Sequence, residues 1–128
     1  TGMCKLIATI VLFILSQSAL LYLATQKISS ASAWYSSGPL AHFTALFFTT
    51  AVLILILRDR HVHAPYARAI SFLYAIIAAA GVELIQRNLP YRTAALDDFF
   101  IGVLGSAVYL LIDWAVVRFI MPRLRHQS

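Results

Sequence analysis

Charged residues are scarce in this chain of 128 residues, and that scarcity excludes several classes of protein. Asp, Glu, Lys and Arg together make up 12% of the sequence, about half the share found in an ordinary soluble domain. With a mean hydropathy of +0.82, too few polar residues remain to cover a water-soluble globule. A soluble enzyme and a disordered tail are therefore excluded.

Cysteine occurs only once, at Cys4. A single cysteine cannot form a disulfide within the chain, so a disulfide-stabilised scaffold is excluded as well. The sequence also contains no motif typical of a Ser-His-Asp catalytic triad, no glycine-rich phosphate loop and no paired-cysteine motif. The common sequence patterns of nucleophilic catalysis, phosphate binding and zinc binding are thus missing.

Apolar residues are abundant, at 61% of the chain, and they concentrate in four segments at about residues 6–24, 40–57, 69–86 and 99–121. Each segment is close to the ~20 residues that cross the hydrocarbon core of a bilayer as a helix. None shows the strict alternation of a membrane strand. The sequence therefore predicts an all-α membrane protein: residues 1–128 form a single transmembrane domain, a four-helix bundle with short loops.

The first segment also has some features of a cleaved signal peptide. Lys5 precedes the apolar run, and the small residues Ala31, Ser32 and Ala33 follow it. The apolar run is longer than the hydrophobic region of a usual signal peptide. We therefore expect the segment to be a membrane helix.

The basic residues predict the orientation of the helices. Beside the two termini and the second loop lie Lys5, Arg58, Arg60, Arg68, Arg123 and Arg125. The opposite side has only Lys27, Arg87 and Arg92. Because Lys and Arg are enriched on the cytoplasmic side, both termini are predicted to be cytoplasmic. The high isoelectric point, near 9.8, then reflects topology and contact with anionic lipid headgroups rather than nucleic-acid binding.

This topology places a set of polar residues at the outer ends of three helices and in the loop between the last two. The set is His42, Glu83, Gln86, Arg92, Asp97 and Asp98. Glu83 interrupts an otherwise apolar run, and an ionisable residue in such a place is a candidate for a functional site. The set is predicted to converge in one outward-facing patch that could bind a ligand.

A structural interpretation of the same residues stays open. Glu83 could pair with Arg87 at the next helical turn. Asp97 and Asp98 could cap the fourth helix and oppose its dipole. Arg92 could bind a lipid phosphate.

The spacing of this set resembles the signature of VanZ-like membrane proteins. In that family a Glu is followed by a Gln three residues later, by an Arg, an Asp and finally a Gly; the corresponding residues here are Glu83, Gln86, Arg92, Asp98 and Gly105. His42-Phe43 also resembles the His-Phe element of the family. The family consists of small multi-helical proteins and is named for a protein associated with low-level resistance to teicoplanin. The resemblance implies a location in the bacterial inner (cytoplasmic) membrane.

Two functions from different classes follow. The chain could be an accessory subunit without catalytic activity that packs against a larger membrane protein complex, with lipids and other membrane proteins as its partners. Alternatively, it could bind or modify an anionic lipid-linked or cell-wall-related group through the outward-facing patch. The family commonly has Asp-Lys before the His and an Asn after the Asp, where this chain has Gly38-Pro39 and Gly102. The loss of these polar residues favours the accessory role over an enzyme.

No cofactor or metal is predicted, although two patterns resemble ligand-binding sites. Gly38 and His42 have the spacing of a tetrapyrrole-binding helix, in which imidazole ligates the metal of the pigment. Asp59, His61 and His63 alternate in the second loop as metal ligands can, but a further ligand is missing. A solvated loop is the alternative interpretation of those three residues.

Two further polar residues are expected to have structural roles. Asp113 lies near the cytoplasmic end of the fourth helix, and we expect it to form an ion pair with Arg118 or with the second loop. Gln17 lies in the outer half of the first helix, where an interhelical hydrogen bond is expected.

Overall fold

The structure is a computed structural model that describes residues 2–25, 39–90 and 96–127. Its elements, in chain order, are α1 (Gly2–Thr25), α3 (Pro39–Asp59), α4 (Ala64–Arg87), α5 (Leu96–Ala115), η1 (Val116–Ile120) and α6 (Met121–Arg125). α5, η1 and α6 follow one another directly and form one long span. Four helices in all are long and apolar enough to cross a membrane, and no strand occurs in the described part of the chain. The predicted all-α four-helix bundle is confirmed, and the chain has the architecture of an integral membrane protein.

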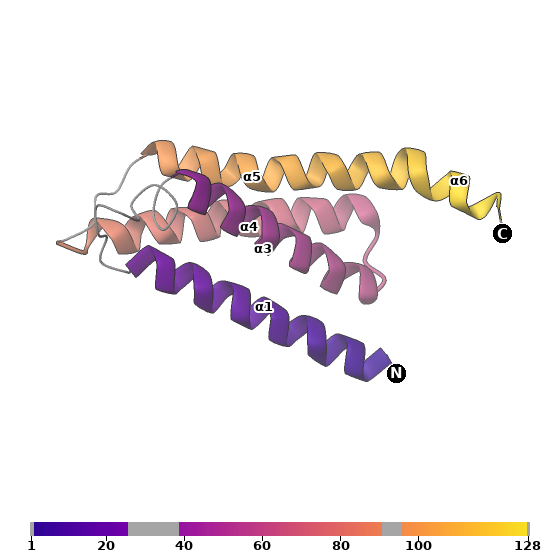
Figure 1. Ribbon diagram of the computed structural model, residues 1–128, viewed down its shortest axis with the longest axis horizontal. Coiled ribbons are helices and arrows are strands. Elements are labelled where there is room, and N and C mark those ends of the chain that lie inside the picture. Colours follow the sequence, from indigo (N-terminus) through magenta and orange to yellow (C-terminus); the bar gives the residue numbers. More distant parts are fainter. Residues whose placement is uncertain (1, 26–38, 91–95, 128) are drawn as a thin grey trace.

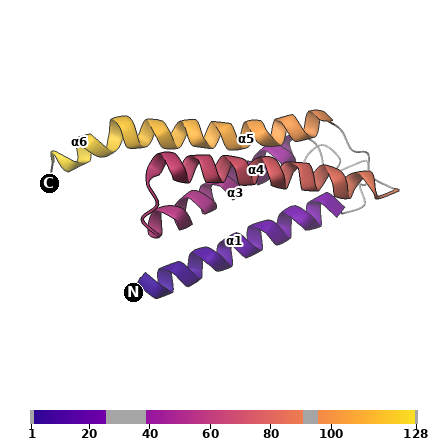
Figure 2. The same cartoon turned by 180° about the vertical axis from the view of Figure 1, so that it is seen from behind.

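The helices run alternately up and down the bundle. The N-terminus, the turn between α3 and α4 and the C-terminus lie at one end of the molecule, which we call the terminal end (Figure 1). α1 and α4 end, and α3 and α5 begin, at the opposite end (Figures 1 and 2). Chain segments that are far apart in sequence are thereby brought to the same depth.

The closest packing joins α3 and α5, and small residues on α5 make it possible. Gly102, Gly105 and Ser106 are buried on the face toward α3. A Cβ placed on Gly105 would collide with the backbone carbonyl oxygen of Phe43, and a Cβ on Gly102 would lie 3.4 Å from Cγ of Leu46. Because small residues let helix backbones approach, they are enriched at helix contacts in membranes.

α4 presents a second stripe of small residues. The buried residues Ala67, Ser71, Ala75 and Ala79 recur at every fourth position, with Val82 next on the same face. Residues four apart share one face of a helix. This stripe turns toward the other helices: Ala75, Ala79 and Val82 pack in one cluster with buried residues of α1 and α3.

α1 is the least buried helix. Among its described side chains only Leu20 and Ala24, both near its C-terminal end, are buried. Toward the N-terminus, α1 runs along the outside of the bundle (Figure 1). Most of its apolar surface therefore faces outward.

The helices extend beyond the apolar segments from which they were predicted. The connection expected at residues 58–65 is a turn of only four residues, because Arg58 and Asp59 belong to α3 while Ala64 and Pro65 belong to α4. Proline suits the first turn of a helix, where its missing N–H is not needed. The apolar segments at 69–86 and 99–121 likewise became helical spans at 64–87 and 96–125.

The turn after α3 has the form of a Schellman motif. The N–H of Val62 donates to the carbonyl of Leu57, and the N–H of His61 donates to the carbonyl of Arg58. His61 has a φ of 60°, in the left-handed region that glycine usually occupies at this position. The chain can reverse sharply here, which brings α4 back alongside α3.

Candidate functional site

The predicted polar patch contains one pair of residues from different helices. His42 lies in the first turn of α3 and Asp98 in the first turn of α5. Nε2 of His42 is 3.6 Å from Oδ2 of Asp98, and both side chains are largely buried. The close contact of α3 and α5 places an imidazole beside a carboxylate at this end of the bundle.

Glu83 lies in a different setting, on the side of α4 that faces the start of α5. It lines a groove of about 300 Å³ together with Arg87, Leu96 and Phe99. The groove thus combines a carboxylate and a guanidinium with apolar walls. Such a lining suits an amphipathic ligand or a lipid.

The other members of the predicted patch are distributed around it. Gln86 is fully buried and its Nε2 lies 3.4 Å from the carbonyl oxygen of Ala24, so this side chain faces α1. Asp97 is exposed in the first turn of α5, where a carboxylate opposes the helix dipole. Arg92 lies outside the described residues. Among the described members, His42 and Asp98 are brought together, whereas Gln86 points toward another helix.

The middle of the bundle holds a polar network that joins three helices. The hydroxyl of Tyr74 on α4 donates to Oε1 of Gln17 on α1 at 2.7 Å, and Nε2 of Gln17 donates to Oγ1 of Thr49 on α3 at 3.0 Å. A second contact joins Oγ of Ser106 on α5 to Oγ1 of Thr50 on α3, 2.6 Å apart. The interhelical hydrogen bond expected of Gln17 is confirmed. Polar groups inside a membrane need such partners because lipid offers none.

Asp113 forms an ion-pair cluster nearer the terminal end. Its side chain is 3% exposed, and its two carboxylate oxygens lie 2.7 and 2.8 Å from Nη2 of Arg58. Nη1 of Arg68, on α4, is 3.2 Å away. Arg118 and the second loop are the two partners expected for Asp113. The observed partner is Arg58, at the start of the expected loop. In the structure this residue belongs to the last turn of α3. Arg68, which the sequence also places beside the second loop, belongs to α4, and the sequence does not single it out as a partner because it does not give the rotation of α4 about its axis.

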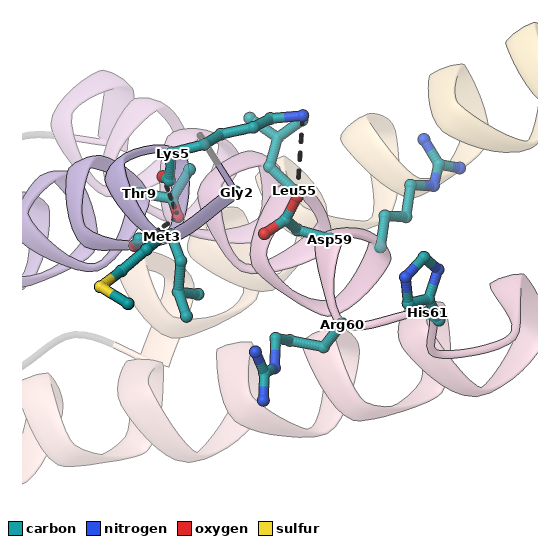
Figure 3. Close-up of a pocket in the computed structure, with 10 residues that line it drawn as sticks. Gly2, Met3, Lys5, Thr9, Leu55, Asp59, Arg60 and His61 are labelled. Carbon is teal, nitrogen blue, oxygen red and sulfur yellow. Dashed lines mark hydrogen bonds and ion pairs between the residues drawn. The ribbon is translucent and has the colours of Figure 1, made fainter.

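A larger groove lies at the terminal end, between the first turns of α1 and the end of α3. Its volume is about 720 Å³, and its lining includes Lys5, Leu55 and Arg60. Figure 3 shows Lys5 reaching from α1 toward Asp59, with a distance of 3.7 Å between Nζ and Oδ1. The sequence predicts that these basic residues lie on one side of the membrane, but it does not predict a groove among them.

The described residues contain no group of three or more His, Cys, Asp or Glu side chains that could hold a metal ion. Of the three residues whose alternation resembles a set of metal ligands, Asp59 faces Lys5, while His61 and His63 are exposed. For the pigment pattern, Nε2 of His42 is directed at Asp98 inside the bundle, and Gly38 lies outside the described residues.

Comparisons of the chain with protein-family models, with curated proteins and with solved structures find no match.

Proposed function

We propose that the chain is a VanZ-like protein of the bacterial inner membrane that serves as a non-catalytic subunit of a larger membrane protein complex. The observation that carries the proposal is that several polar groups along the helices are bonded to neighbouring helices. Gln17, Tyr74, Thr50 and Ser106 bond to residues on neighbouring helices, and the buried Asp113 is held by two arginines. These groups stabilise the bundle itself, which is what a structural subunit requires.

The outer surface of α1 is the proposed contact with the partner. In this 24-residue helix only Leu20 and Ala24 are buried among the described side chains, so most of its surface lies outside its own bundle. Its outward side chains include Val11, Leu12, Ile14 and Leu15. These form an apolar, uncharged face, so the occupant we propose is a transmembrane helix of another subunit.

Mild solubilisation of native membranes followed by a native gel tests this proposal. The chain should migrate in a large complex, at a constant ratio to the other subunits in successive preparations. Leu12→Trp on α1 should weaken that association without lowering the melting temperature of the chain. Leu111→Trp, at an even more exposed position on α5, is the matched control. Migration of the parent chain as an isolated small particle under the same conditions would refute the accessory role.

The proposal includes cytoplasmic termini, and the support is the distribution of basic residues along the chain. Each Lys or Arg beside a span favours the cytoplasmic side, and the terminal end has the larger number. A Cys4→Ser background carrying Ser36→Cys should be labelled by an impermeant thiol reagent from outside. Labelling only from the cytoplasm would invert the orientation.

A second candidate function rests on the groove beside Glu83. Arg87 lies in the same groove, and the His42–Asp98 pair lies at the same end of the bundle. The guanidinium could hold an anionic lipid-linked group, which could then exchange a proton with a neighbouring side chain. Here the guanidinium is the binding group and the imidazole or carboxylate the acid–base group. This candidate predicts a phenotype that depends on Glu83.

A further inference from the structure

We infer that the groove at the terminal end is a binding site for one anionic phospholipid. The groove lies between the N-terminal turns of α1 and the end of α3, and it is separate from the polar patch at the opposite end of the bundle. Its volume of about 720 Å³ lies within the range of small-molecule sites in proteins, roughly 300–1,000 Å³. The inference rests on the chemistry of its lining.

The lining divides into a cationic part and an apolar part. Lys5, Arg58 and Arg60 contribute positive charge, whereas Met3, Leu6 and Leu55 contribute apolar surface. Figure 3 shows that Lys5 and Met3 come from α1, while Leu55 and Arg60 come from α3 and the turn that follows it. A phospholipid has the matching division, with an anionic phosphate above apolar chains. Free inorganic phosphate has no use for the apolar part.

The charges around the groove do not cancel. Asp113 is the buried partner of both Arg58 and Arg68, so one carboxylate serves two guanidiniums. Asp59 faces Lys5, and Arg60 adds a further cation at the same edge. Four cations against two carboxylates leave an excess of two positive charges, which an anion would balance. Basic pockets between membrane helices bind anionic headgroups on this electrostatic basis.

The loose packing of α1 leaves room for such a lipid. The side chains of α1 near the groove are not buried, and the one ion pair described there, between Lys5 and Asp59, is long and has a Lys5 side chain that is 72% exposed. A pair so exposed contributes little stability. A lipid whose headgroup lies in the groove between Lys5 on α1 and Arg60 after α3 would therefore join two elements that are in loose contact here.

The test uses the full chain, purified in a mild detergent and titrated separately with phosphatidylglycerol, cardiolipin and phosphatidylcholine. Native mass spectrometry counts the lipids that remain bound. We expect one anionic lipid per chain and no retention of phosphatidylcholine at the same concentration. Preference for cardiolipin over phosphatidylglycerol would indicate that two phosphates are held, and equal retention would indicate one. Equal retention of phosphatidylcholine would overturn the inference.

Variants locate the site. Lys5→Gln with Arg60→Gln should weaken phosphatidylglycerol binding by about tenfold or more, given the usual contribution of each cation near an anionic headgroup. Arg118→Gln with Arg123→Gln removes the same charge from exposed residues of η1 and α6 and should change binding by less than about twofold. An equal loss in both double variants would mean that only the general surface charge attracts lipid, and would overturn the site.

Two further measurements separate the groove from charge alone. Leu55→Trp keeps every charge and fills the groove at an exposed position, so it should also reduce lipid retention while the melting temperature of the lipid-free protein stays unchanged. Inorganic phosphate at the same concentration should not displace the lipid. Normal binding by Leu55→Trp, or displacement by phosphate, would contradict a lipid site in this groove.

Discussion

Nη2 of Arg58 lies 2.7 Å from Oδ1 of Asp113, and this contact joins the end of α3 to a buried carboxylate on the fourth span. A carboxylate in such a place is stable only with hydrogen-bonded cationic partners. Arg68 supplies the second partner at 3.2 Å. Three helices are thus tied together at one depth by a single acidic side chain.

Replacing that side chain should strongly destabilise the bundle. In Asp113→Asn, Arg58 and Arg68 would face each other without an anion between them, and breaking a buried pair in this way costs about 3–5 kcal/mol. Thermal or chemical unfolding in detergent measures the loss. Asp97→Asn is the matched control, because Asp97 is exposed and its interaction with the helix dipole is worth only about 0.5 kcal/mol. Equal stability of the two variants would show that the cluster is not needed for the fold.

Gly105 should tolerate no side chain. A Cβ there would meet the carbonyl oxygen of Phe43, with the carbonyl carbon 3.0 Å away, so α3 and α5 would have to separate. We expect Gly105→Ala to lower the free energy of unfolding by about 1–3 kcal/mol or more. Gly81→Ala is the control on α4, where nothing lies within 4 Å of the added Cβ; it should be neutral or stabilise by about 0.5–1 kcal/mol.

The hydrogen bond between Tyr74 and Gln17 should be measurable as a coupling energy. A double-mutant cycle with Gln17→Leu and Tyr74→Phe should give about 0.6 kcal/mol, and at most about 1.7 kcal/mol, as for other bonds between membrane helices. Tyr22→Phe, an exposed tyrosine on α1, should show no coupling to Gln17→Leu. The absence of coupling between Gln17 and Tyr74 would mean that α1 does not turn its Gln17 face toward α4.

How much of this could be predicted from the sequence differs between the helices and their contacts. Hydropathy predicts four spans because each apolar run is long enough to cross the bilayer. Hydropathy places the ends of the helices too early, as at Arg58 and Asp59. A charged side chain at the end of a helix extends into the polar interface while its backbone remains helical. The run of apolar residues therefore ends before the helix does.

Contacts between helices depend on rotations that the sequence does not specify. The depth of Asp113 follows from the rise per residue of a helix, which is why the second loop was a correct expectation for its partner. Neither Arg68 nor the Tyr74 partner of Gln17 could be predicted in the same way. On α1 the sequence indicates that Gln17 faces another helix, but it does not indicate which helix or which residue Gln17 contacts.

The turn at His61 should become more stable when the residue is glycine. A non-glycine residue pays roughly 1 kcal/mol for left-handed backbone, and the φ of His61 is 60°. His61→Gly should therefore raise the free energy of unfolding by up to about 1 kcal/mol in lipid-free detergent. At His63, with φ −59° and ψ 137°, glycine removes no strain and increases the entropy of the unfolded chain. His63→Gly should be neutral or destabilising. An equal change in the free energy of unfolding for His61→Gly and His63→Gly would show that the left-handed backbone of His61 is not strained.

Glu83→Gln separates the two candidate functions. Gln keeps the size of the side chain, and a neutral amide is less costly than a carboxylate in the half-buried, largely apolar groove that Glu83 lines. For a structural subunit, the variant should keep its melting temperature in detergent, or raise it, and should still assemble into the large complex. Asp97→Asn removes one acidic charge from an exposed position at the same end of the bundle and is the matched control. If Glu83→Gln keeps its stability and assembly but abolishes the cellular phenotype while Asp97→Asn does not, the carboxylate acts on a ligand, and the binding of an anionic envelope group replaces the accessory role as the better proposal.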